Sequence, residues 1–320
     1  MKNRIIELSN HEFVRVSGSD AVSFLQGQIT ANLDNLSADN CVSAALCNLK
    51  GRVIADFRVI LRDDDCILQT SKGMAGIIIS TLAKYAVFSK VEISHEQDIV
   101  ARGIMMASDQ AGPNVDGFDS FPARSNQCLQ NSDALLLKLE CAGMDKSGDA
   151  SKHRADQRFE LWQFHNSVCA VENSGAGSPE SDLSDWQRGD ILSGTVHVDQ
   201  SISEMYTPQL LNYDISGVVD FDKGCYTGQE VVARMHYRGK AKKRLFLLRL
   251  KETGITVPCE RTISLGEGFE QTEVEILSAV STAETDNDST KSLVLAVMAT
   301  GVSTAGEAAE ASIIELAYSK

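Results

Sequence analysis

The residues best suited to chemistry in this chain lie in the segment 223–230, which reads Lys-Gly-Cys-Tyr-Thr-Gly-Gln-Glu. A thiolate is a far better nucleophile than a thiol, and a neighbouring cation or a helix N-terminus stabilises it. Cys225 has Lys223 two residues before it, and an apolar pattern of helical period follows. We therefore expect Cys225 to be a reactive thiol. The alternative is a buried cysteine in an ordinary turn.

A helix is expected directly after this cysteine. Apolar residues recur at helical spacing in the stretch 231–235. Thr227 with Glu230 three residues later matches a capping box, in which two side chains accept hydrogen bonds from the first N–H groups of a helix. The two glycines of the segment 223–230 permit a tight turn or the close approach of a ligand. The pattern therefore predicts a helix N-terminus just after Cys225.

Positive charge is concentrated in the stretch that follows. No acid lies between Glu230 and Glu252, and this stretch contains Arg234, Arg238, Lys240, Lys242, Lys243, Arg244, Arg249 and Lys251. The whole chain has a net charge of −14, which argues against nonspecific nucleic-acid binding by its entire surface. A basic run is most often a solvated strand edge. Beside a candidate site in an acidic protein, it favours a patch for an anion.

The elements that position these groups are a mixture of strands and helices. Strands are expected at 12–16, 42–49, 53–61, 66–70, 89–93 and 134–140, and helices at 20–26, 73–85, 157–166 and 185–191. Irregular segments are expected at 108–133 and 173–184. Short β-like segments at 245–250, 262–265, 274–280 and 293–298 suggest a small barrel. Strands joined as hairpins, without a βαβ repeat, indicate an α+β fold.

Composition and cysteine spacing argue against several classes of protein. Hydrophobic residues make up 43% of the chain and charged residues 23%, as in ordinary globular proteins. No apolar run reaches the roughly 18–20 residues that cross a bilayer, and the N-terminus carries no secretory pattern. The eight cysteines include no Cys-x-x-Cys pair and the six histidines are dispersed, so we expect no metal site.

The segment 223–230 closely resembles the signature of the YgfZ family, folate-binding proteins related to the T-protein (aminomethyltransferase) of the glycine cleavage system. Other blocks that resemble the family are 16–30, 48–52, 84–91, Trp186 with Ile191 and Gly194, and Pro208-Gln209 with Asn212. The match runs from about residue 12 to about residue 250. The resemblance implies a ring formed by two α+β regions, 1–100 and 101–243, and a C-terminal β-barrel, 244–320, around a central folate-binding opening.

The resemblance also implies which residues bind tetrahydrofolate. Trp186 occupies a position where relatives have a folate-contacting tryptophan, with core packing as the alternative, and Phe13 falls where relatives can have another tryptophan, although an aromatic residue on a strand is usually part of a core. Gln209 and Asn212 suit polar edges of the ligand or the stabilisation of a loop. Cations suit the glutamate tail. The full expected set is Phe13, Trp186, Gln209, Asn212, Lys223, Tyr226, Gln229, Glu230, Arg234 and Arg238.

One residue that an aminomethyltransferase needs is missing. T-proteins carry an aspartate after the strand that corresponds to 66–70, where a carboxylate orients the reacting amine and handles protons. This chain has no acid between Asp65 and Glu92, so the expected position, in 71–76, contains none. T-proteins also lack the cysteine signature. A folate-dependent accessory factor is therefore favoured over a classical aminomethyltransferase.

The resemblance implies a cytoplasmic, monomeric protein that supports the assembly or repair of iron–sulfur enzymes. One such client is the enzyme that methylthiolates tRNA, so the effect on tRNA modification is indirect, with no stable nucleic-acid complex and no membrane partner. Two alternatives stay open. The first is a glycine-cleavage-type aminomethyltransferase, and the second is a protein that binds tRNA directly through the basic stretch 234–251.

Overall fold

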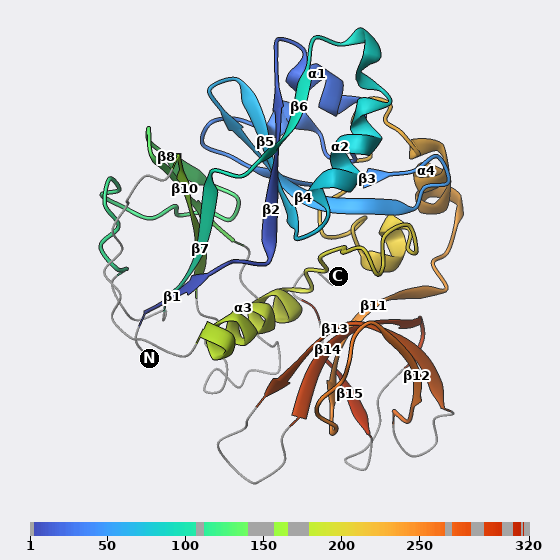
Figure 1. Cartoon of the computed structure of the whole chain (residues 1–320). Helices are drawn as coiled ribbons and strands as arrows, with labels where there is room; N and C mark the ends of the chain where they lie inside the picture. Colours follow the sequence, from blue (N-terminus) through green and yellow to red (C-terminus); the bar gives the residue numbers. More distant parts are fainter. Residues whose placement is uncertain are drawn as a thin grey trace.

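Three five-stranded antiparallel sheets form most of the computed structural model (Figure 1). The structure describes residues 3–106, 112–139, 157–165, 179–265, 271–282, 291–302, 310–314 and 316. Four α-helices and short 3-10 turns pack around the sheets in this part of the chain. The α+β class predicted from the hairpin pattern is therefore confirmed. No helix in the described ranges is long and apolar enough to cross a membrane.

The first sheet has the strand order β3-β4-β5-β2-β6. Its strands are β2 (His11–Ser17), β3 (Val42–Cys47), β4 (Val53–Arg62), β5 (Asp65–Ser71) and β6 (Glu92–Glu96). Helices α1 (Ala21–Gln26) and α2 (Ala75–Ala83) cover one face, where Ile78 and Leu82 join the core because they lie four residues apart on one side of α2. The strands and helices predicted for this region are all found, the last strand starting three residues later than expected.

The second sheet has the order β1-β7-β10-β9-β8. Its strands are β1 (Arg4–Glu7), β7 (Ile99–Met106), β8 (Cys128–Gln130), β9 (Ala134–Lys138) and β10 (Gln157–Phe164). The helix predicted at 157–166 is wrong, because β10 is the central strand of this sheet. Its two faces are both buried, Phe159 and Leu161 in one apolar cluster and Trp162 and Phe164 in another. Period alone does not separate so short an apolar run from a helix.

The third sheet has the order β12-β13-β14-β11-β15. Its strands are β11 (Lys243–Leu250), β12 (Cys259–Ile263), β13 (Thr272–Thr282), β14 (Lys291–Ala299) and β15 (Ala311–Ile314). Side chains alternate across β11, so that Leu245 and Leu247 face one core cluster and Leu248 and Leu250 another. Within the described residues no pairing joins β12 to β15, so the sheet is open there. The closed barrel stays a prediction.

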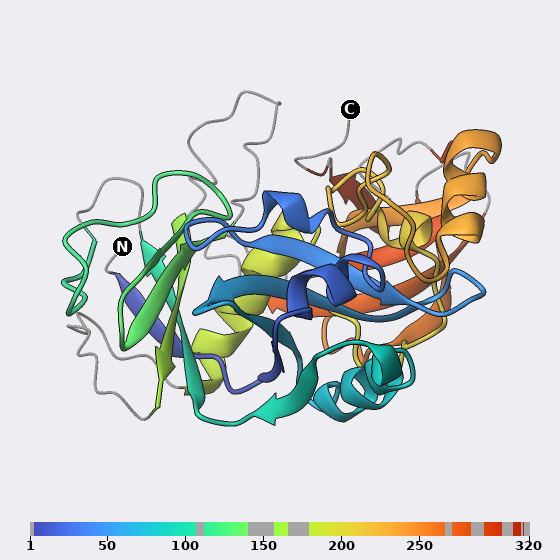
Figure 2. The same cartoon turned by 90° about the horizontal axis from the view of Figure 1, so that it is seen from above.

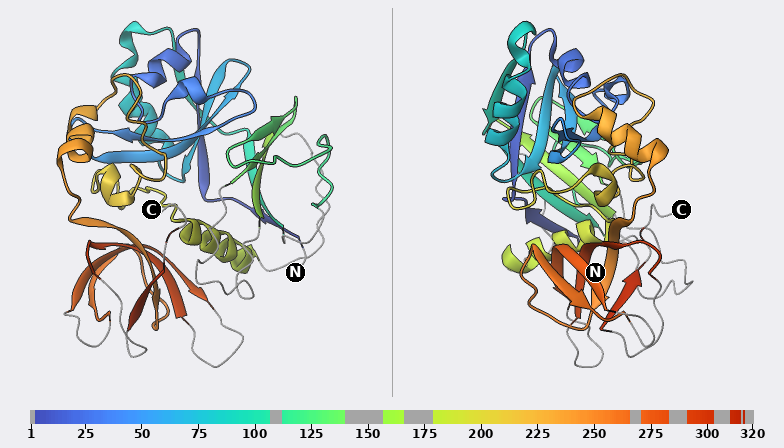
Figure 3. Two further views of the ribbon diagram at one scale, coloured as in Figure 1. Left: turned by 180° about the vertical axis from the view of Figure 1, so that it is seen from behind. Right: turned by 90° about the vertical axis from the view of Figure 1, so that its right-hand side faces the viewer.

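Helix α3 (Pro179–Ser193) connects the sheets. It contacts β1 of the second sheet, and β13 and β14 of the third. Figure 3 shows this helix between the two N-terminal sheets and the C-terminal sheet, and in the view from above in Figure 2 the strands of the first sheet pass over it. The sequence predicted its stretch 185–191 but not its earlier start, and the residues 173–178 of the predicted loop lie outside the described residues.

The segment after α3 runs through the 3-10 turn η3 (Pro208–Leu211) to helix α4 (Gln229–Arg238). The turn between β3 and β4 packs closely against the start of α4. A Cβ atom added to Gly228 would lie only 2.5 Å from the carbonyl oxygen of Asn48 in that turn. The division of the chain at residues 100 and 243 stays a prediction. Strand β1 belongs to the second sheet although it lies in the first predicted segment.

Candidate functional site

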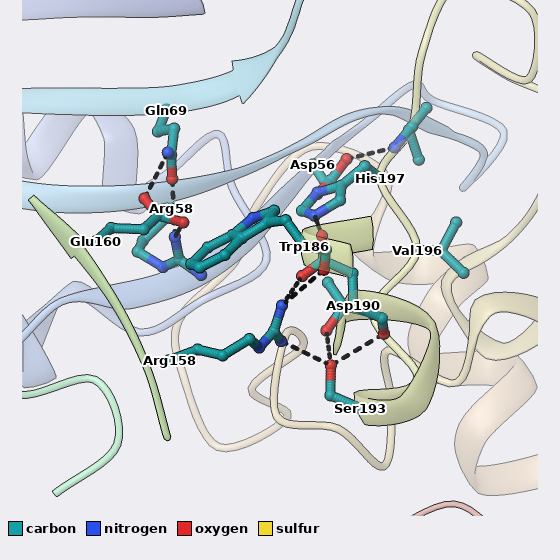
Figure 4. Close-up of polar contacts among 12 residues, drawn as sticks. Asp56, Arg58, Gln69, Arg158, Glu160, Trp186, Asp190, Ser193, Val196 and His197 are labelled. Carbon is teal, nitrogen blue, oxygen red and sulfur yellow. Dashed lines mark hydrogen bonds and ion pairs between the residues drawn. The ribbon is translucent and has the colours of Figure 1, made fainter. Parts of the chain in front are cut away.

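A cavity with a volume of about 360 Å³ lies where the first two sheets meet α3. Strands β3, β4, β5 and β10, helix α3 and the segment 194–220 all contribute to its wall. The volume is within the range of small-molecule sites. Its wall is rich in ionisable and polar side chains, which include His11, Asp56, Arg58, Gln69, Arg158, Glu160, Trp186, Asp190 and His197. Figure 4 shows the contacts among most of these residues.

Trp186 is the aromatic residue of α3 in this wall, and only 1% of its surface is exposed. The guanidinium carbon of Arg158 lies 5.1 Å from the centroid of its ring, within cation–π range. Its six-membered ring also packs on Gly103 of β7, where an added Cβ would come within 2.5 Å of the ring. The sequence-predicted ligand residue Trp186 therefore lies in the cavity wall, in contact with Arg158 and with Gly103.

Arg58 of β4 and Glu160 of β10 form an ion pair across the two sheets, with 3.2 Å between Nη1 and Oε1. Gln69 Nε2 donates to Glu160 at 2.6 Å, and Trp162 Nε1 donates to the same carboxylate oxygen at 2.8 Å. Burial alone would raise the pKa of Glu160, but the Arg58 cation and these donors hold it below the usual value. Glu160 is therefore an ionised carboxylate at neutral pH.

Two polar atoms of this wall have no hydrogen-bond partner within the described residues. They are Arg58 Nε and His11 Nδ1. Burial lowers the pKa of His11, so its imidazole is neutral and offers a donor or an acceptor according to its tautomer. A buried polar atom without a partner costs free energy unless a water or a ligand supplies one. The cavity therefore has hydrogen-bonding capacity that the protein itself does not use.

His197 lies between two carboxylates, in the segment that follows α3. Its Nδ1 is 3.3 Å from Asp56 Oδ2 and its Nε2 is 3.7 Å from Asp190 Oδ2. Burial opposes the charge, but the contacts with Asp190 and Asp56 raise the pKa of His197 to about 10. Asp190 also accepts a 2.6 Å hydrogen bond from Arg158, and its pKa lies well below the usual range. His197 is therefore an imidazolium that joins β4 to α3.

Sequence motifs do not single out these charged residues of the cavity wall. The signal was available, since Asp56 and Arg58 interrupt the apolar run 53–61, and Glu160 interrupts the run 157–164. A charged residue on a buried strand is rarely tolerated without a partner. The sequence nevertheless gives no indication that these positions, about a hundred residues apart, share one cavity.

Cys225 is exposed and lies three residues before the N-cap of α4. The predicted capping box is wrong. The N-cap is Gly228, with φ of 86°, and no side chain caps the helix. Thr227 instead donates a 3.0 Å hydrogen bond to Gln28. Only glycine adopts this left-handed conformation readily, so Gly228 turns the chain into the helix.

Lys223 points into the protein. Its ammonium donates to the carbonyl oxygens of Gln26 at 2.7 Å, Ile29 at 2.7 Å and Ala31 at 2.8 Å. Burial lowers its pKa to about 8. The ammonium also lies 5.2 Å from the ring centroid of Tyr226, which is itself buried. All three ammonium protons are used, so the geometry gives Lys223 a structural role and leaves it no donor for a ligand tail.

Three more of the expected ligand residues lie outside the central cavity. Phe13 is buried in the apolar cluster that also contains Trp162 and Phe164. Its ring is edge-on to that of Trp162, with 5.0 Å between the ring centroids. Gln209 donates to the carbonyl oxygen of Val232 at 2.8 Å, and Asn212 to that of Leu245 at 2.9 Å. Both amides thus join η3 to neighbouring elements, which matches the loop-stabilising alternative.

Helix α4 carries Gln229, Glu230, Arg234 and Arg238, none of which lines the central cavity. Glu230, Arg234 and Arg238 are exposed. The cations of the basic stretch 234–251 differ in whether an acid neutralises them. Lys243 pairs with Glu275 at 2.8 Å and Arg244 with Asp214 at 2.8 Å, whereas Arg234, Arg238, Lys240 and Lys242 form no ion pair among the described residues. No group of three or more metal-ligating side chains occurs in the part of the chain that the structure describes.

The sequence of this chain is similar to those of known proteins, although no family model matches it. The tRNA-modifying protein YgfZ of Yersinia pseudotuberculosis is 31% identical over 278 residues, which cover 86% of this chain and 80% of the relative. That of Yersinia enterocolitica is 30% identical over 249 residues, 76% of this chain and 70% of the relative.

A solved structure shares the fold at low sequence identity. The glycine cleavage system aminomethyltransferase T from Bartonella henselae superposes with a TM-score of 0.60 at 13% identity, covering 93% of this chain and 78% of that one. The fold predicted from the resemblance is thus confirmed at the level of the T-protein architecture. Together with the identity over most of both sequences, this shows that the chain belongs to the family of YgfZ tRNA-modifying proteins.

Proposed function

We propose that this protein binds tetrahydrofolate in the central cavity and supports the assembly or repair of iron–sulfur enzymes, and through them tRNA methylthiolation. One observation carries the folate proposal. The cavity of about 360 Å³ has Trp186 in its wall, and two buried polar atoms there, Arg58 Nε and His11 Nδ1, have no partner among the described residues. The tRNA part is supported by the relatives, which are described as tRNA-modifying proteins.

The wall residues fit the flat part of folate. A pterin has donors and acceptors along one edge, and such a ring system suits an aromatic surface with a few fixed polar groups. Trp186 offers the aromatic surface, Arg58 Nε offers a donor, and His11 offers either a donor or an acceptor. Glu160 and Gln69 hold the Arg58 guanidinium in place, so its orientation is fixed before a ligand arrives.

The anionic tail is assigned to cations outside the wall. Arg158 is engaged with Asp190, and Lys223 with three carbonyl groups. Arg234 and Arg238 of α4 therefore remain the proposed partners of the glutamate carboxylates. Guanidinium groups bind carboxylates in a bidentate manner, and exposed ion pairs of this kind weaken as salt increases.

Cys225 is proposed as the functional thiol. It is exposed, so it is able to meet a client protein such as an iron–sulfur tRNA methylthiotransferase. A single thiol does not complete a four-ligand cluster site, which favours an accessory role over permanent cluster binding. Tyr226, Gln229 and Glu230 are proposed to position this segment. A cytoplasmic location and a complete ring closed by a C-terminal barrel belong to the same proposal.

A calorimetric titration with 5-formyltetrahydrofolate, a stable reduced folate, tests the ligand. Wild type and Cys225→Ala are expected to bind equally well, and Trp186→Ala weakly. Cellular tRNA methylthiolation in a strain that depends on the protein tests the thiol, which should be lost with Cys225→Ala. No binding by the wild type would refute the folate proposal, and full activity of Cys225→Ala would refute the role of the thiol.

A further inference from the structure

Two buried thiols meet at the edge of the first sheet. Cys41 precedes β3 and Cys128 opens β8. Both thiols donate to oxygens of one residue, Asn126, from Cys41 Sγ to Oδ1 at 3.9 Å and from Cys128 Sγ to the main-chain carbonyl oxygen at 3.7 Å. The backbone holds them together from both sides. Cys41 N–H donates to the carbonyl oxygen of Asn126 at 2.9 Å, and Cys128 N–H donates to that of Asp39 at 2.9 Å. The two chain segments are therefore paired like antiparallel strands, with Asn40 opposite Gln127 and the two cysteines on either side of that pair.

The pair also borders the central cavity. Cys41 is one of the cavity-lining residues, although only 1% of its surface is exposed to bulk solvent, and Cys128 is 2% exposed. Only a small molecule that enters the cavity reaches Cys41. The other thiols buried in β3 and β5, Cys47 and Cys66, lie in apolar clusters that contain no second cysteine among the described residues, and burial raises the pKa of each to about 12.

The two thiols are not equivalent. Cys41 is among the residues that line the cavity, and Cys128 is not. The neighbouring Cys128 thiol lowers the pKa of Cys41, and the nearby Arg58 cation acts in the same direction against the burial of the thiol. The neighbouring Cys41 thiol and burial raise the pKa of Cys128. An oxidant that enters the cavity therefore meets Cys41 first, so Cys41 is the attacking thiol and Cys128 keeps its proton until a later step.

We propose that Cys41 and Cys128 are a redox-active dithiol that a small hydroperoxide, entering through the central cavity, oxidises to a disulfide. The Cys41 thiolate attacks one peroxide oxygen, the O–O bond breaks, and a sulfenic acid forms as hydroxide leaves and takes up a proton to become water. The Cys128 sulfur then attacks the Cys41 sulfur and displaces the sulfenic oxygen, which leaves with two protons as a second water. Hydrogen peroxide gains the two electrons that the two sulfurs lose.

The disulfide would act on the cavity wall. It would tie the segment 39–41 covalently to 126–128, and it would replace the Cys41 thiol, which shares the cavity wall with Arg58. The exposed Cys225 is chemically separate, because a reagent reaches it from solvent without entering the cavity. This proposal does not depend on the identity of the cavity ligand.

Peptide mass spectrometry after treatment of the reduced full-length protein with hydrogen peroxide tests the pair. Cys225→Ser is used as the background, so that disulfides between molecules do not obscure the result. We expect a peptide crosslink between Cys41 and Cys128 that a reducing agent removes. Adding Cys66→Ser, the matched buried control, should leave the yield unchanged.

Trapping of the intermediate tests the order of the steps. In Cys128→Ser, dimedone should label the sulfenic acid of Cys41, whereas in Cys41→Ser the remaining Cys128 should stay unlabelled. Recovery of both residues as thiols in the folded background protein, at peroxide concentrations that oxidise Cys225 in the wild type, would overturn the proposal. Equal dimedone labelling of both single variants would do the same. Circular dichroism verifies that each variant is folded.

Discussion

Lys223 donates a 2.8 Å hydrogen bond to the carbonyl oxygen of Ala31, and Ala31 lines the central cavity. The same ammonium binds the carbonyls of Gln26 and Ile29, so the loop 26–31 wraps around one buried cation. Cys225 follows two residues later on the exposed side. The segment that carries the thiol is thereby joined to the cavity wall by one side chain.

Replacing Lys223 with Met should destabilise the protein and weaken ligand binding together. The substitution leaves three carbonyl groups without their donor, at a cost of about 1–3 kcal/mol for each that finds no water. Thermal unfolding and calorimetric folate titration measure the two effects. Lys240→Met, which removes an exposed ammonium, is the control and should change neither quantity. Unaltered stability of Lys223→Met would contradict the structural role of the ammonium.

Replacing Trp186 with Ala should weaken reduced-folate binding by about 1–3 kcal/mol, a typical loss for a buried aromatic contact. Folate should also quench the fluorescence of Trp186. Trp162 is the only other tryptophan, so the quenching measured in Trp162→Phe reports Trp186 alone. Undiminished affinity of Trp186→Ala would mean that the ligand lies elsewhere.

The imidazolium of His197 should make stability depend on pH. Its pKa rises from 6.5 in the unfolded chain to about 10 in the fold. Its stabilising contribution is therefore complete below about pH 6.5 and is lost as the pH increases towards 10. The urea midpoint of the wild type should fall more steeply over this window than that of His197→Gln. The lowered pKa of Lys223 acts oppositely above pH 8, but it is common to both proteins and cancels in their difference. Parallel midpoint curves would refute this assignment.

The exposed cations of α4 should distinguish folates by tail length. Polyglutamylated folate should bind more tightly than the monoglutamate, the difference should shrink with added salt, and Arg238→Ala should reduce it. Lys243→Ala is the matched control, because Glu275 already neutralises that side chain. Salt-sensitive binding of tRNA by the isolated protein, without preference for longer tails, would favour direct tRNA binding instead.

Cys225 should be the fastest cysteine to alkylate among the six that the structure describes. It is exposed, whereas Cys41, Cys47, Cys66 and Cys128 are buried and Cys259 is partly so. Iodoacetamide labelling of the native protein, followed by peptide mass spectrometry, measures each rate. Cys259 is the internal reference for partial exposure. Slower labelling of Cys225 than of Cys259 would argue against a functional thiol at this position.

Sequence patterns revealed local features of this protein better than distant ones. The start of a helix after Cys225 and the position of Trp186 on a helix follow from short-range spacing. The cap of that helix does not follow from the spacing. Thr227 and Glu230 predict a capping box, whereas the N-cap is Gly228 in a left-handed conformation. The residues of strand β10 read as a helix in the sequence, because burial on both faces of a strand removes the alternation of apolar and polar residues that identifies it.

Contacts between distant residues lay beyond the patterns. Asp56 and His197 are 141 positions apart, and Arg58 and Glu160 are 102 apart. Their pairing depends on how the first sheet packs on β10 and α3, which no local window contains. The inward orientation of Lys223 also depends on distant residues, because its ammonium binds three carbonyl oxygens in the stretch 26–31.

The close packing of Gly103 against Trp186 limits how this protein can diverge. Any side chain at position 103 would occupy the space of the indole ring. The two positions are therefore expected to change together in evolution, with a larger residue on β7 accompanied by a smaller one on α3. Gly103→Ala should destabilise the protein on its own but be tolerated together with Trp186→Phe. The width of the cavity would then depend on the residues at both positions together.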